Sequence, residues 1–206
     1  MTEKKKEPRV VKPGIGYVDT LVTKIILPTL PAWRALRFTP NGLTTLGLTS
    51  SIACVYFLYN RQLGATLVCL AARWYFDYAD GLMARKYNET SSFGDYYDHI
   101  TDAVFSVGIT MVLVCGKYPS GSGKWCIDRL KPILLGILVV FFALFAVQMG
   151  CIETHYHTEG DKETSISRLR HMCPVEIEHV IKCFDNGTLY IVVAIIIYLF
   201  CTVGKL

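Results

Sequence analysis

The sequence predicts an all-α fold: a polytopic transmembrane helical bundle of five to six spans, preceded by an N-terminal interfacial helix. Of the 206 residues, 52% are hydrophobic, and the mean hydropathy is +0.36, which is high for a soluble domain. Residues 132–150 and 187–203 contain no charged side chain, and about 20 mostly apolar residues suffice to cross a bilayer. Because backbone polar groups in lipid must be satisfied internally, these runs are predicted to be helices.

Five spans are expected, and they cover residues 42–59, 62–85, 95–116, 131–150 and 187–204. The first is rich in Thr and Ser, and the second is interrupted by Arg73, Asp77 and Asp80. A sixth span would require a membrane-embedded helix within residues 174–186. Residues 174–184, inside the longest hydrophilic stretch of the chain, are a candidate for a short helix, whether or not it enters the membrane.

The chain divides into three regions of different character. Residues 1–14 are polar and basic and are expected to form a disordered tail without a cleavable signal peptide. Residues 15–38 are apolar but interrupted by two prolines, which indicates an interfacial helix lying on the membrane. The expected anchors of this helix are Trp33, Arg34 and Arg37. The membrane domain covers residues 39–206 and begins with the helix start Thr39-Pro40-Asn41.

Basic residues in the flanks of the spans predict the orientation of the bundle. Lys and Arg precede the first span and lie between spans two and three and between spans four and five. These regions are placed in the cytosol, although the opposing loop, residues 116–131, also carries basic residues. The net charge of +4 is assigned to this bias and to anionic headgroups. The expected partner is therefore the lipid bilayer, with no nucleic acid.

Eight polar or small residues, from the last part of the second span to the first part of the third, stand at fixed spacings. The pattern is Asp77-x2-Asp80-Gly81-x2-Ala84-Arg85-x8-Gly94-x3-Asp98-x3-Asp102. With about 100° per residue, the first two aspartates share one helix face with Gly81 and Ala84. Asp98 and Asp102, four residues apart, share a face of the next helix. The intervening turn lets both faces converge, which predicts four clustered carboxylates near the cytosolic edge of the bilayer.

Such a cluster requires cations, because clustered carboxylates repel one another and lose hydration. Hard oxygen ligands select Mg²⁺ or Mn²⁺ over Zn²⁺, and two such ions about 3.5–4 Å apart assist phosphoryl chemistry. Gly81 and Ala84 leave room for a phosphate or nucleotide, and Arg85 can hold a phosphate oxygen. A carboxylate not fully committed to metal can accept a proton from an attacking hydroxyl.

At every motif position the pattern resembles the CDP-alcohol phosphatidyltransferase (CDP-alcohol phosphotransferase) family. The resemblance implies a membrane transferase of phospholipid biosynthesis, in which two Mg²⁺ or Mn²⁺ ions bind the diphosphate of a CDP-linked donor. A hydroxyl acceptor attacks and CMP leaves; a homodimer is also implied. In this chain the implied metal ligands are Asp77, Asp80, Asp98 and Asp102, with Asp102 also the general base. The implied donor contacts are Gly81, Ala84 and Arg85, and Gly94 allows close helix packing at the substrate site.

Several alternatives stay open at the level of the sequence. CDP-diacylglycerol is the expected donor, and the first alternative is transfer from CDP-choline or CDP-ethanolamine to diacylglycerol. An acidic cation channel or transporter would usually spread its acids across the midplane of several helices. An inactive member of the family, acting as a scaffold, would keep the same residues.

Other polar side chains have simpler interpretations. Arg73 is expected to form a buried ion pair or to snorkel rather than bind nucleotide, and Asp95 is expected to be a first-turn acid. His99 lies on a different face from Asp98. A disulfide between Cys115 and Cys126 is conceivable. One set of residues suggests zinc, although its spacing matches no common structural site: Cys151, His155, His157, His171 and Cys173.

Overall fold

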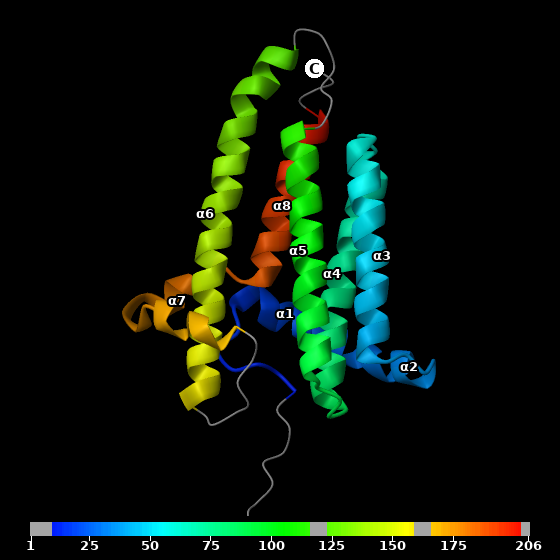
Figure 1. The fold of residues 1–206 in the computed structure, drawn as a ribbon, viewed down its shortest axis with the longest axis vertical. Coiled ribbons are helices and arrows are strands. Elements are labelled where there is room, and N and C mark those ends of the chain that lie inside the picture. Colours follow the sequence, from blue (N-terminus) through cyan, green and yellow to red (C-terminus); the bar gives the residue numbers. More distant parts are fainter. Residues whose placement is uncertain (1–9, 116–122, 159–165, 203–206) are drawn as a thin grey trace, which may run out of the picture.

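The computed structural model describes residues 10–115, 123–158 and 166–202, with side chains omitted for residues 123–129, and these ranges contain helices and no strand. Five long helices run along the length of the molecule (Figure 1). They are α3 (Pro40–Tyr59), α4 (Leu63–Lys86), α5 (Ser92–Cys115), α6 (Gly123–Thr158) and α8 (Asn186–Thr202). The predicted all-α bundle is therefore confirmed.

Each of the five predicted spans lies largely or wholly within one of these helices. Within the described residues, α3, α5 and the Leu130–Thr158 part of α6 are long and apolar enough to cross a membrane. The segment Val175–Ile181 with α8 forms a bent fourth candidate. The helix α4 has 24 residues, which suffices in length, but its charged side chains lower its hydropathy. The helix α6 continues to Thr158, beyond the predicted end at residue 150, because helical structure persists after the apolar run ends.

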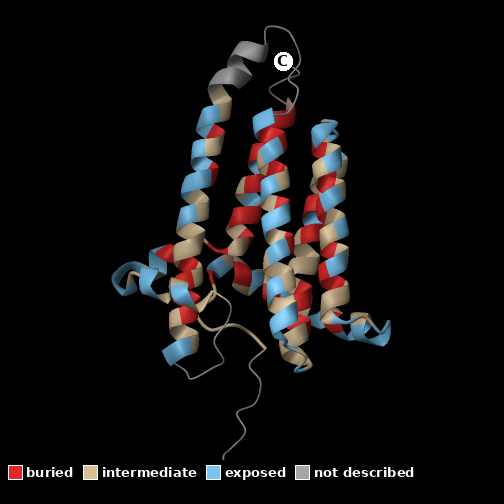
Figure 2. Ribbon diagram, viewed as in Figure 1, coloured by how far each residue is buried: buried red, intermediate tan, exposed pale blue. Residues whose placement is uncertain are grey.

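The larger apolar core joins buried side chains of α3, α4, α5, α6 and α8. Side chains of α8 such as Val193, Ile197 and Phe200 are buried there. Large apolar side chains on the outer faces, such as Ile137 and Val140 of α6, are instead exposed (Figure 2). An outward apolar face on a long helix is what lipid contact requires, so burial follows the pattern of a membrane bundle.

At one end of the bundle, α1 (Tyr17–Ile26) and α2 (Leu30–Ala35) lie across the long helices (Figure 1). The 3₁₀ turn Leu27–Thr29 separates them, so the single helix expected over residues 15–38 is broken near its prolines. Trp33, an expected membrane anchor, donates a hydrogen bond of 2.7 Å from Nε1 to the hydroxyl of Tyr75 on α4. The position of these helices on a membrane surface stays a prediction.

The helix start before α3 is confirmed. Thr39 is the N-cap residue, and its hydroxyl accepts a hydrogen bond of 3.2 Å from the backbone N–H of Gly42. Pro40 occupies the first helical position, where its missing N–H is not needed. This cap fixes where α3 begins, next to the ends of α4 and α5 that carry the aspartate motif.

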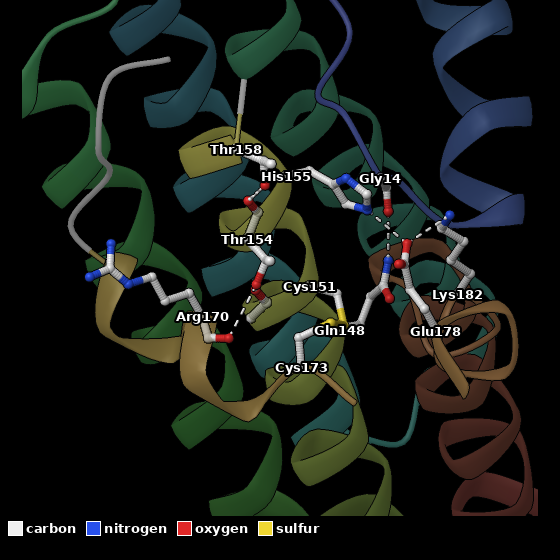
Figure 3. The surroundings of a disulfide bond; sticks show 11 residues. Gly14, Gln148, Cys151, Thr154, His155, Thr158, Arg170, Cys173, Glu178 and Lys182 are labelled. Carbon is white, nitrogen blue, oxygen red and sulfur yellow. Dashed lines mark hydrogen bonds and ion pairs between the residues drawn. A yellow bond between two sulfur atoms is a disulfide. The ribbon is translucent and has the colours of Figure 1, made fainter. Parts of the chain in front are cut away.

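The segment after α6 folds back onto it through short helices: η2 (Ser167–Met172), η3 (Val175–Ile177) and α7 (Glu178–Ile181). A disulfide joins Cys151 to Cys173 (Figure 3). The two cysteines of the suggested zinc set are therefore bonded to each other and offer no thiolate, so a zinc site, which the spacing already argued against, is wrong. Cys115 has a free thiol, so its suggested disulfide is also wrong; the side chain of Cys126 lies outside the described residues. Which cysteines approach each other depends on how the chain folds back after α6, and no local pattern predicts this.

Candidate active site

The aspartate motif lies on the last turns of α4 and the first turns of α5. The chain reverses just after α4, where Asn88 has a left-handed φ of 56° and the N–H of Glu89 donates to the carbonyl of Ala84 at 2.7 Å. A Cβ on Gly94 would lie 3.0 Å from Oδ1 of Asn41, so α5 begins in close contact with the start of α3. The reversal brings the polar faces of α4 and α5 together, as the spacing predicted.

Three of the four motif aspartates meet. One carboxylate oxygen from each of Asp77, Asp98 and Asp102 lies within 4.8 Å of the others, and we call these residues the open carboxylate group. Asp80 is buried beside them, and its Oδ2 accepts a hydrogen bond of 2.6 Å from the hydroxyl of Thr44 on α3. The structure therefore joins Asp80 to α3 and leaves the other three facing one another.

Arg73 supplies the internal cation of this group. Its side chain is fully buried and donates to Asp77 at 3.0 Å and also to Asp102. The predicted buried ion pair is confirmed. One guanidinium compensates one of three carboxylates, and Oδ1 of Asp98 is buried without a hydrogen-bond partner in the described part of the chain. A buried acceptor left unpaired among like charges is the environment that a divalent cation would satisfy.

The two carboxylates that bind Arg73 differ in access. The Asp77 side chain is 6% exposed, and its Oδ2 also accepts a hydrogen bond of 2.8 Å from Nδ2 of Asn186, at the start of α8. The Asp102 side chain is 46% exposed and can meet a second molecule. Sequence reasoning did not identify Asn186 as part of the site, although a polar residue opening an apolar helix was an available signal.

The residues expected to contact the donor lie beside this group. At Gly81, where room for a phosphate or nucleotide was expected, the structure places the side chain of Arg85. The guanidinium of Arg85 folds back over Gly81, where a Cβ would lie 3.2 Å from Nη1. Nε of Arg85 donates to the carbonyl of Val10 at 2.8 Å. Gly81 thus makes room for Arg85 as well as exposing backbone. Ala84 is half-buried on the same turn.

A cavity opens next to Asp102, between α5, α6 and α8. Its empty space is about 550 Å³, including the part open to its surroundings. Asp102, Ser106 and Asn186 form its polar part, and the remaining lining is apolar, with Phe105, Ile109, Leu138, Phe142, Phe145, Leu189, Tyr190 and Val193. The accessible carboxylate therefore faces a space suited to an apolar chain with a polar end.

Together, fold and site define a helical membrane protein with an acidic, metal-compatible centre toward one end of its bundle. The sequence profile of the CDP-alcohol phosphatidyltransferase family matches residues 37–204; the chain belongs to this family, whose members generally depend on divalent metal ions.

One curated relative is CDP-diacylglycerol–inositol 3-phosphatidyltransferase of Saccharomyces cerevisiae. It is 27% identical over 141 residues, which are 68% of this chain and 60% of that protein. The chain thus spans less than two thirds of the length of this relative. No solved structure matches the chain.

Proposed function

We propose that this protein transfers a phosphatidyl group from CDP-diacylglycerol to a hydroxyl acceptor and releases CMP, as a step of phospholipid biosynthesis. The observation that carries the proposal is the open carboxylate group, which joins an unpaired buried oxygen of Asp98 to the accessible carboxylate of Asp102. The name of the yeast relative supports CDP-diacylglycerol as the donor. The apolar cavity beside Asp102 supports a lipid substrate.

The residues present fit divalent metal ions. Asp77, Asp98 and Asp102, with Asp80 beside them, offer the hard oxygen ligands that Mg²⁺ and Mn²⁺ prefer. When bound, two such ions would neutralise the diphosphate of the donor and the charge on departing CMP. Arg73 compensates only part of the carboxylate charge, so the group keeps its attraction for cations.

Asp102 is proposed as the general base. It would accept the proton of the acceptor hydroxyl while the acceptor oxygen bonds to the β-phosphorus and the bond from that phosphorus to CMP breaks. Arg73 holds one oxygen of Asp102, which orients the carboxylate and leaves the second oxygen to meet the acceptor. Arg85, beside Gly81 on the same helix, is proposed to bind a donor phosphate.

A second candidate is transfer of a phospho-alcohol from CDP-choline or CDP-ethanolamine to diacylglycerol. The cavity favours it, because an acceptor that reached Asp102 through this apolar space would itself be a lipid. The two candidates share the site and the release of CMP but differ in which substrate carries the acyl chains.

The test is CMP release by the purified protein in detergent with Mg²⁺ or Mn²⁺. CDP-diacylglycerol, CDP-choline and CDP-ethanolamine would each be combined with inositol, serine, glycerol 3-phosphate and diacylglycerol. We expect CMP from CDP-diacylglycerol with one polar acceptor, and none from the Asp98→Asn protein. CMP only from CDP-choline or CDP-ethanolamine with diacylglycerol would establish the second candidate. A folded, metal-loaded protein that releases no CMP from any pair would favour the inactive scaffold.

The side of the membrane and the oligomeric state are further proposals. The flanking charges favour a cytosolic position for the motif, whereas the Cys151–Cys173 disulfide at the same end of the bundle favours an oxidising compartment. Labelling a single exposed cysteine such as Cys183 in sealed vesicles, in a variant with Cys115 replaced, would decide between them. The homodimer also stays a proposal, since the structure contains one chain.

A further inference from the structure

The segment Val10–Gly16, here called the N-terminal strap, joins several helices at the end of the bundle that carries the active site. Its first contact is with α4, where Val10 accepts the 2.8 Å hydrogen bond from Arg85. Its second is with α6, where the carbonyl of Gly14 accepts a 3.0 Å hydrogen bond from Nε2 of Gln148 (Figure 3). The strap therefore reaches from α4 to α6, beside the donor-contact residues.

Two glycines leave the strap little freedom in this position. Gly14 has a φ of +68°, and a Cβ there would lie 2.4 Å from Cδ2 of His155. A Cβ on Gly16 would lie 2.2 Å from Cβ of Asp185. Only glycine fits at such approaches, so the sequence of the strap suits a path that passes directly over α6 and the start of α8.

The surface of α6 under the strap is itself held in place. Glu178 of α7 pairs with two basic side chains of its surroundings: its carboxylate lies 2.8 Å from Nε2 of His155 and 2.9 Å from Nζ of Lys182 (Figure 3). The Cys151–Cys173 disulfide fixes the segment before α7 to the same part of α6. The strap thus rests on a braced surface rather than on a free loop.

Lys12 lies between the two anchored points of the strap, two residues after Val10, whose carbonyl accepts the hydrogen bond from Arg85. Burial and the neighbouring guanidinium of Arg85 lower the pKa of Lys12, while the carboxylates of Asp98, Glu153 and Asp95 act in the opposite direction. Two cations side by side are unfavourable unless an anion lies near both. The strap therefore carries a second cation close to Arg85, and the Asp98 carboxylate acts on its charge.

We propose that Lys12 is a donor-binding residue, which acts with Arg85 to hold a phosphate of the CDP-linked donor at the mouth of the site. This inference rests on the proposed function, because it assigns the pair of cations to the donor of that reaction. The ammonium group of lysine is a compact charge with three donors and suits an anionic phosphate oxygen. The strap would thus form one wall of the donor site.

The test is the affinity of the purified full-length protein for CDP, measured by titration calorimetry with Mg²⁺ present and with cytidine as the phosphate-free comparison. Lys12→Ala is expected to weaken CDP binding by roughly tenfold or more, the usual effect of losing a charged hydrogen bond, and to leave cytidine binding unchanged. Lys12→Arg should restore most of the affinity. Lys24→Ala removes an exposed lysine of α1 and serves as the matched control.

With turnover, the same variants separate binding from chemistry. Lys12→Ala should raise KM for the donor and leave kcat within about twofold, as expected for a contact made equally in the ground and transition states. CDP affinity and KM that match the wild type in Lys12→Ala would overturn the inference. Tighter CDP binding would also overturn it, since the strap would then cover the site instead of forming it.

Failure of the inference can be told apart from failure of the proposed function. A wild-type protein that releases CMP, with Lys12→Ala unchanged, contradicts only the role of Lys12. A wild-type protein that binds CDP through Lys12 but turns over none of the donor–acceptor pairs contradicts only the reaction. A wild-type protein that fails to bind CDP contradicts both.

Discussion

Two groups of carboxylates lie at the same end of the bundle, and they differ in how their oxygens are satisfied. In the first, Asp19 of α1 accepts hydrogen bonds from the N–H of Gly187 at 2.8 Å and from the hydroxyl of Tyr78. Asp185 accepts from the N–H of Asp19 at 2.9 Å and from the N–H of Thr188 at 2.8 Å. This closed carboxylate group, Asp19 and Asp185, fastens α1 to the start of α8.

In the open carboxylate group of Asp77, Asp98 and Asp102, no hydrogen bond from a backbone N–H to a carboxylate oxygen is present among the described residues. Its partners are side chains, chiefly Arg73, and Oδ1 of Asp98 has no partner in the described residues. Backbone N–H groups at helix starts are fixed donors that stabilise a carboxylate without metal. Hydrogen-bond satisfaction, rather than the number of acidic residues, therefore separates a structural acidic group from one suited to bind cations.

Replacing an aspartate of the open carboxylate group should change activity more than any other substitution considered. Asp98→Asn should reduce CMP release by a factor of about a thousand or more, because removing a metal ligand removes charge stabilisation that the reaction needs. Its thermal stability should match or exceed that of the wild type, because a repelling charge is lost. Asp19→Asn, in the closed group, is the matched control and should keep its activity. Comparable activity in Asp98→Asn and wild type would remove Asp98 from the mechanism.

The next effect is on stability. Arg73→Met leaves Asp77 and Asp102 without their shared cation, and breaking a buried ion pair on one side costs about 3–5 kcal/mol. Arg34→Met is the control, because Arg34 pairs with Glu89 at 2.7 Å on the surface, where such a pair contributes about 0–1 kcal/mol. Thermal unfolding in detergent measures both. Equal shifts in the two variants would show that Arg73 is not the cation that holds the open group together.

The smallest effect is the pH dependence of the closed group. Burial, with the charge of Asp185 adding to it, raises the pKa of Asp19 from 3.8 to about 6. Between these values the folded protein binds more protons than the unfolded chain, so the free energy of unfolding falls as pH rises and stays low above pH 6. The loss is at most about 3 kcal/mol.

Asp19→Asn keeps an oxygen that can accept from Gly187 and removes the charge. This variant should therefore lose the decrease in stability between pH 4 and 6, and thermal melts at several pH values measure it. If the stability of the wild type relative to Asp19→Asn instead increased from pH 4 to 6, the pKa of Asp19 would be lowered, and not raised, by folding.

The fold and the centre of the site were largely predictable from the sequence, because both depend on local patterns. Hydropathy located the helices, and the spacing of Asp77, Asp98 and Asp102 placed these residues on facing turns of consecutive helices. Arg73 was expected to form a buried ion pair or to snorkel, and the structure shows the ion pair, with Asp77 one helical turn further along α4.

The remaining features depend on contacts between distant parts of the chain. Asn186 is 109 residues from Asp77, and Val10 is 75 residues from Arg85. No periodicity within either segment encodes such a contact. The strap was expected to belong to a disordered tail, residues 1–14, yet residues 10–14 make defined contacts; residues 1–9 lie outside the described residues. The Cys151–Cys173 disulfide was likewise set by the way the chain folds back after α6.

The most direct test of the difference between the two groups is the number of Mn²⁺ ions bound, measured by electron paramagnetic resonance on purified wild-type, Asp98→Asn and Asp19→Asn proteins. We expect two ions in the wild type, two in Asp19→Asn and fewer in Asp98→Asn. Wild-type protein that binds no Mn²⁺, or Asp98→Asn protein that binds as many ions as the wild type, would contradict the assignment of the open carboxylate group as the metal centre.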